Sequence, residues 1–72
     1  MAYDYSKLSG KISEKFDTRY NFAKEMGISE RSISLKLNGK VGFKQDEIIR
    51  ACRLLGIKEK DIAEYFFNLD VQ

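Results

Sequence analysis

The fold that this chain can adopt is constrained most by five small or apolar residues at fixed spacing near its centre. They are Ala23, Gly27, Ile28, Ile33 and Leu37. A small residue lets two helices cross closely, a glycine permits a tight turn, and the apolar side chains that follow anchor a second helix from behind. The spacing therefore predicts a helix-turn-helix over about residues 19–38, a motif whose second helix can enter the major groove of DNA.

The first helix of the predicted motif follows Thr18, an acceptable N-cap residue, and the second runs from Ser29, a preferred N-cap residue, to Asn38. The face turned away from the apolar anchors carries Glu30, Arg31, Ser34 and Leu35, with Asn38 near its end. Arg31 is the first candidate for base readout because a guanidinium group can bond both acceptors of guanine. Glu30 can accept a hydrogen bond from cytosine but repels phosphate. The alternative for both residues is an ordinary solvated helix face.

Basic residues surround this face and suit phosphate contacts, which position a protein on DNA without reading its sequence. They are Arg19, Lys36, Lys40 and Lys44. The charge distribution agrees, since residues 1–44 carry nine Lys and Arg against five Asp and Glu, whereas residues 45–72 carry four against six. If the chain binds nucleic acid, the first two-thirds should therefore do so. The alternative role of these side chains is solubility.

The rest of the chain has the pattern of further short helices. Apolar residues recur at the spacing of one helix face at Tyr5, Leu8, Ile12 and Phe16. Two more helices, over about residues 44–55 and 59–69, should close the core or meet a partner. The last of them is expected to bury Ile62, Phe66 and Leu69. Strand-like alternation is absent, so we predict an all-α fold, with one compact domain of about five short helices over residues 1–72.

Two apolar features leave alternatives open. Leu35 lies about 200° round its helix from the anchoring residue on either side, so it should be exposed. An exposed leucine there can touch a thymine methyl group, pack on a protein partner or have no role. Tyr65, Phe66 and Phe67 are consecutive, so either Tyr65 or Phe67 should be partly exposed. The functional interpretation is a dimer or partner surface, and the alternative is a ring packed against the first helix.

The residue types needed for most catalysis in small domains are missing. The chain has no histidine and one cysteine, Cys52, so it offers neither a zinc-ligand set nor a Cys/His nucleophile. Carboxylate pairs at helical spacing, such as Asp61 and Glu64, should form surface ion pairs. No apolar run approaches the roughly 20 residues that cross a bilayer. We expect a cytoplasmic protein that is not an enzyme and uses no metal or cofactor.

Six stretches carry a resemblance to a known family: DYSKLSGKI (4–12), YNFA (20–23), MG (26–27), SER (29–31), SLKLN (34–38) and YFFN (65–68). They resemble the Modulator of Repression proteins of temperate phages of lactic-acid bacteria and their Cro-like relatives. The resemblance runs nearly end to end. It implies a Cro/repressor-like fold and a regulator of the lysis/lysogeny switch, acting as an antirepressor together with the phage repressor.

The resemblance implies two kinds of partner. Modulator of Repression proteins form a complex with the helix-turn-helix domain of the repressor, whereas the Cro-like relatives bind operator DNA. One alternative is therefore a stand-alone Cro-like operator-binding repressor, which would need a homodimer because a single module binds DNA weakly. The other is a purely protein-binding module that blocks the repressor without touching DNA.

Overall fold

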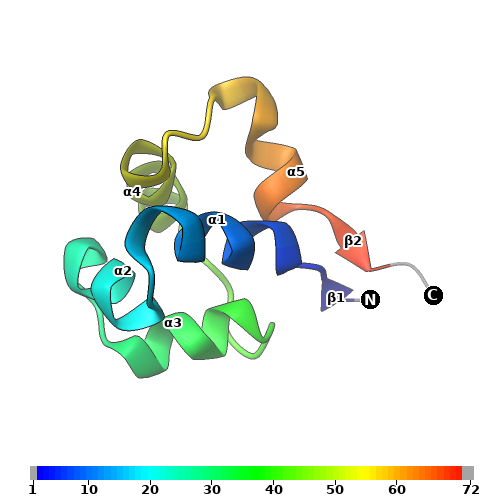
Figure 1. Ribbon diagram of the computed structural model, residues 1–72. Helices are drawn as coiled ribbons and strands as arrows, with labels where there is room; N and C mark the ends of the chain where they lie inside the picture. Colours follow the sequence, from blue (N-terminus) through cyan, green and yellow to red (C-terminus); the bar gives the residue numbers. More distant parts are fainter. Residues whose placement is uncertain (1, 71–72) are drawn as a thin grey trace.

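The computed structural model describes residues 2–70, which form five α-helices, a 3-10 helix and a two-stranded ribbon. The elements in chain order are β1 (Ala2–Tyr3), α1 (Ser6–Phe16), α2 (Arg19–Met26), α3 (Glu30–Leu37), α4 (Gln45–Leu55), η1 (Glu59–Asp61), α5 (Ile62–Phe66) and β2 (Leu69–Asp70). In Figure 1, α1 crosses the centre of the view, with α2 and α3 on one side and α4 and α5 on the other. The predicted all-α fold of about five short helices is confirmed.

One apolar core joins all five helices. Its buried residues are Tyr5, Leu8, Ile12, Phe22, Ala23, Met26, Ile33, Leu37, Ala51, Cys52, Leu55, Ile57 and Phe66. Burying a large apolar side chain contributes about 1.5–3 kcal/mol, so this set is the main source of stability. The predicted inner face of α1 is confirmed, although its last member, Phe16, is only partly buried.

The last helix is shorter than the sequence predicts. The helix expected over residues 59–69 is divided into η1 and α5, and α5 ends at Phe66. Leu69, which was expected to be buried, is 46% exposed. The backbone leaves the helix at Phe67, and the carbonyl of Asn68 accepts a hydrogen bond from the amide of Asp4 at 2.6 Å. Pairing with the start of the chain therefore overrides the local apolar spacing.

The ribbon pairs the two ends of the described chain. Strands β1 and β2 are antiparallel, with Ala2 opposite Asp70 and Tyr3 opposite Leu69. Two residues are too few to show alternation, so the sequence gives no signal for these strands. Figure 1 shows both strands at the end of α1 where the helix begins, next to the end of α5.

Candidate functional site

Helices α2 and α3 begin at the residues that the sequence predicts as caps. The side-chain oxygen of Thr18 accepts a hydrogen bond from the amide of Asn21 at 3.1 Å. That of Ser29 accepts one from the amide of Ser32, also at 3.1 Å. Each cap satisfies a backbone donor that the first turn of a helix leaves free. Ser29 therefore fixes where α3, the predicted reading helix, begins.

The turn between α2 and α3 is held by a glycine and by an arginine from another helix. Gly27 has a φ of +77°, which strains any residue with a side chain. Arg50, on α4, donates a hydrogen bond from Nη1 to the carbonyl of Met26 at 2.8 Å. The role of Arg50 was not predictable from the sequence, because its contact is with a residue far away in the chain.

Most of the predicted site residues lie at the surface around α3. The exposed ones are Ser29, Glu30, Arg31, Asn38, Lys40 and Lys44. Arg19 and Ser34 are partly buried and lie together, with Nη1 of Arg19 3.4 Å from Oγ of Ser34. This contact links the start of α2 to the middle of α3. The outer face of α3 therefore carries Arg31 as an exposed cation, while Arg19 is partly engaged within the domain.

Lys36 is buried, so its assignment as a phosphate contact is wrong. Its Nζ lies 3.0 Å from Oε1 of Glu47 on α4 and donates a hydrogen bond to the carbonyl of Gly42, also at 3.0 Å. Lys36 directly precedes the anchoring residue Leu37 and lies at the edge of the buried face. A buried ammonium group is tolerated there because it is paired.

Leu35 is partly buried, which corrects the expectation that it is exposed. The chain after α3 turns back toward it, and the carbonyl of Leu35 accepts hydrogen bonds from the amides of Lys40 at 2.9 Å and Val41 at 3.4 Å. The position of Leu35 on the helix does point away from the two anchors. The loop that follows is hydrogen-bonded to the backbone at Leu35, and a thymine or partner contact by this residue stays a prediction.

Glu47 is a buried carboxylate that sequence analysis missed. Besides Lys36, its Oε1 accepts a hydrogen bond from the backbone amide of Lys44 at 2.8 Å. Burial raises the pKa of Glu47, but the hydrogen bonds from Lys44 and Lys36 outweigh burial and hold the pKa below its ordinary value. The signal in the sequence was a glutamate in the first turn of a predicted helix, where a side chain can reach back to the capping residue.

Replacing Glu47 with glutamine should lower stability at neutral pH, because it leaves buried Lys36 without its carboxylate, and should make stability less sensitive to acid. Because the folded-state pKa is lowered, ionised Glu47 stabilises the fold above the unfolded-state pKa of about 4.3, and this contribution is lost as the pH falls through the folded-state pKa. The melting temperature of the unmodified protein should therefore fall more steeply below about pH 4 than that of Glu47→Gln. Melts followed by circular dichroism at a series of pH values test this. Glu25→Gln, at an exposed position on α2, is the control, and equal slopes for Glu47→Gln and the unmodified protein would contradict the assignment.

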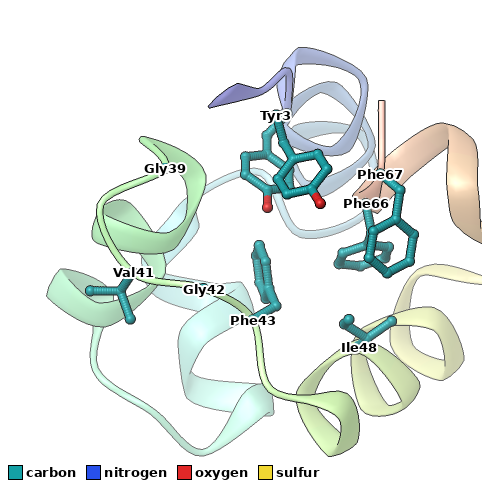
Figure 2. A pocket seen from close by; sticks show the side chains of 9 residues that line it. Tyr3, Gly39, Val41, Gly42, Phe43, Ile48, Phe66 and Phe67 are labelled. Atoms are coloured by element: carbon teal, nitrogen blue, oxygen red, sulfur yellow. The ribbon is translucent and has the colours of Figure 1, made fainter. Parts of the chain in front are cut away.

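An aromatic groove opens between β1, the loop after α3 and the end of α5 (Figure 2). It encloses about 420 Å³ and is lined by Tyr3, Tyr5, Gly39, Val41, Gly42, Phe43, Ile48, Phe66 and Phe67. Figure 2 shows the ring of Phe43 in the middle, Val41 on one side and the rings of Phe66 and Phe67 on the other. The ring of Phe43 packs edge-on against those of Tyr5, at 5.4 Å, and Phe66, at 5.3 Å. Packed rings therefore form the floor of the groove.

The rim of the aromatic groove is exposed. Phe67 is 50% exposed and its ring packs edge-on against Tyr3 at 6.0 Å. The prediction that Tyr65 or Phe67 is partly exposed is confirmed. Tyr65 is partly buried, and Nζ of Lys7 on α1 lies 5.4 Å from its ring centroid. Tyr65 therefore packs toward the first helix, whereas Phe67 faces the groove.

The opposite wall of the aromatic groove was not predicted from the sequence. Val41 and Phe43 lie between the helices predicted over residues 19–38 and 44–55, and no role was expected for them. The available signal was the occurrence of two large apolar residues beside glycines in an otherwise polar loop. Two large apolar residues close together in an exposed segment indicate a binding surface more strongly than a single one does.

Other site classes find no support in the described part of the chain. Residues 2–70 contain no group of three or more side chains placed to hold a metal ion. Burial raises the pKa of the Cys52 thiol, which lies in the core. The described helices are all too short or too polar to cross a membrane.

Comparisons with known proteins find a family and a solved structure that each match nearly the whole chain. The family described as "Protein of unknown function (DUF739)" matches residues 1–69. The solution structure of the modulator of repression (MOR) of the temperate bacteriophage TP901-1 from Lactococcus lactis is 57% identical in sequence. It matches with a TM-score of 0.81 over 100% of this chain and 97% of that chain. A comparison with curated proteins gives no significant match. The resemblance to Modulator of Repression proteins is thus confirmed.

Proposed function

We propose, since this chain belongs to the DUF739 family and is similar over its whole length to a phage modulator of repression, that it is a phage regulator that modulates repression by binding a phage repressor. The name of the similar protein supports the general role. This chain would act in the bacterial cytoplasm, where repressor and operator meet.

The aromatic groove carries this proposal. Three large apolar side chains that line it, Tyr3, Val41 and Phe67, are 45–50% exposed. Single exposed apolar residues are common, but a cluster around a cavity is typical of a binding site. Aromatic side chains in such clusters supply much of the affinity of protein complexes. We therefore assign the aromatic groove as the surface that receives the repressor.

The chemistry of the groove favours a protein partner over nucleic acid. None of the lining residues is basic, so the groove offers no charge to a phosphate. The exposed cations Arg31, Lys40 and Lys44 lie on α3 and in the loop that follows it. Lys36 is no longer among them. The loss of this cation from the predicted DNA surface further favours a role through protein contact.

A mobility-shift experiment tests the proposed function. Operator DNA from the promoter region of the phage is titrated with this protein alone, with the repressor alone and with both, at one salt concentration. We expect no sequence-specific shift by this protein alone and an altered repressor shift when both are present. A specific shift by this protein alone, with the repressor shift unchanged, would overturn the proposal and favour a Cro-like operator repressor.

Exposure of Arg31 on a capped helix favours a second candidate function, direct reading of operator DNA by α3. A single module of this size binds DNA weakly, so this function needs a homodimer or a repressor bound alongside. The helix-turn-helix would then act with the repressor rather than only block it.

Two substitutions test DNA reading. If α3 reads bases, Arg31→Ala should remove about 1–3 kcal/mol of discrimination between operator and random DNA. Lys40→Ala should weaken binding to all sequences and reduce the salt dependence by about one phosphate contact. Fluorescence anisotropy at several salt concentrations measures both effects, with exposed Lys15→Ala on α1 as the control. Unchanged binding in both variants would reject this second function.

A further inference from the structure

A buried ion pair joins α3 to α4 and contacts the loop that lines the aromatic groove. The side chains of Lys36 and Glu47 are only 6% and 10% exposed, and Nζ lies 3.0 Å from Oε1. Separating a buried pair leaves a charge without compensation, so the two groups are held together more firmly than a surface pair. The pair therefore couples the end of α3 to the start of α4.

The same two side chains hold the backbone on both sides of Phe43. Lys36 donates a hydrogen bond to the carbonyl of Gly42 at 3.0 Å. Glu47 accepts one from the amide of Lys44 at 2.8 Å. Nζ of Lys36 also lies 5.9 Å from the ring centroid of Phe43, within the range of a cation–π contact. Three contacts thus fix the loop at the place where Phe43 enters the groove.

The loop fixed in this way is one wall of the aromatic groove. Val41, Gly42 and Phe43 all line it: Val41 and Gly42 lie on the side away from Phe67, and the ring of Phe43 lies between (Figure 2). A displacement of the Gly42 carbonyl would carry the neighbouring side chains Val41 and Phe43 with it, because all three belong to one short backbone segment. The shape of the groove therefore depends on a lysine that does not line it.

We propose that Lys36 is a positioning residue for partner binding. Its ammonium group holds the Gly42 carbonyl and thereby presets the wall formed by Val41 and Phe43, without touching the partner. This inference rests on the proposed function, in which the aromatic groove receives the repressor. Presetting the wall raises affinity because the complex need not order the loop when it forms.

A double variant separates positioning from folding. Lys36→Met alone leaves the Glu47 carboxylate buried without its cation, which can unfold the domain. Lys36→Met combined with Glu47→Gln removes both charges, and the glutamine oxygen can still accept the hydrogen bond from Lys44. Lys36→Arg keeps a cation and its donors. Lys15→Met, at an exposed position on α1, is the control for the same lysine substitution outside the ion pair.

The variants are compared by calorimetric titration with the purified repressor, by thermal melts and by NMR amide shifts of residues 41–44. We expect the double variant to remain folded and to show shifted amide signals in the loop. It should bind the repressor about tenfold more weakly, because binding must then order the side chains of Val41 and Phe43. Lys36→Arg should restore most of the affinity, and Lys15→Met should bind as the unmodified protein does.

Two results would overturn the inference, and they are distinguishable. A folded double variant that binds with unchanged affinity would show that the groove does not depend on Lys36, while leaving the proposed function intact. An unmodified protein that does not bind the repressor would overturn the proposed function and this inference together.

Discussion

Phe67→Ala is expected to weaken the complex with the phage repressor by about 2 kcal/mol, a loss of affinity of roughly thirtyfold. The ring of Phe67 is half exposed at the rim of the aromatic groove and is supported by Tyr3. It can therefore enter a pocket on a partner without first leaving the core. Calorimetric titration of the repressor with each variant measures the change.

The control for this experiment is Tyr20→Ala. Tyr20 is another exposed ring, 58% accessible, but it lies on α2 and does not line the aromatic groove. We expect Tyr20→Ala to bind the repressor normally and both variants to melt close to the unmodified protein. A loss of binding in Tyr20→Ala with none in Phe67→Ala would contradict the proposed contact and move it to the surface of α2 and α3.

Phe66→Ala should affect mainly folding, where Phe67→Ala affects mainly binding. It should lose about 3–5 kcal/mol of unfolding free energy. Phe66 is 1% exposed and belongs to the core, so its removal leaves a cavity beneath the groove. A small domain has a total stability near the lower end of about 5–15 kcal/mol, so this loss is a large share of it. Urea denaturation followed by circular dichroism measures the change.

The neighbouring position provides the comparison for Phe66→Ala. Phe67→Ala removes the same ring from a half-exposed position, so it should cost about 1 kcal/mol or less. Phe66→Leu, which keeps most of the buried volume, should lie between the two. Equal unfolding midpoints for Phe66→Ala and Phe67→Ala would contradict the different burial of the two rings.

The sequence predicted those features of the fold that a few neighbouring residues determine. Thr18 and Ser29 cap their helices as expected, and Gly27 takes the left-handed conformation that ends α2. Each of these features depends on a hydrogen bond or a backbone angle within one turn. The inner face of α1 was predictable for a similar reason, because its apolar spacing is regular.

Features that depend on distant segments were not predictable in this way. A lysine is typical of the protein surface, and only the approach of Glu47 from α4 makes the burial of Lys36 tolerable. The end of α5 depends on the contact between Asn68 and Asp4. The aromatic groove combines three separate parts of the chain, so only one of its exposed members, Phe67, was identified beforehand.

The short ribbon has a consequence for how recognition responds to heat. It joins only two residue pairs among the described residues, and segments with so few backbone hydrogen bonds open at a lower free energy than the core. Tyr3 lies in β1, and Phe67 lies shortly before β2. When the ribbon frays, Tyr3 and Phe67 therefore lose their fixed positions at the rim of the groove, while the core between the helices stays packed. We expect the capacity to recognise a partner to disappear in a local transition that precedes the loss of helical signal.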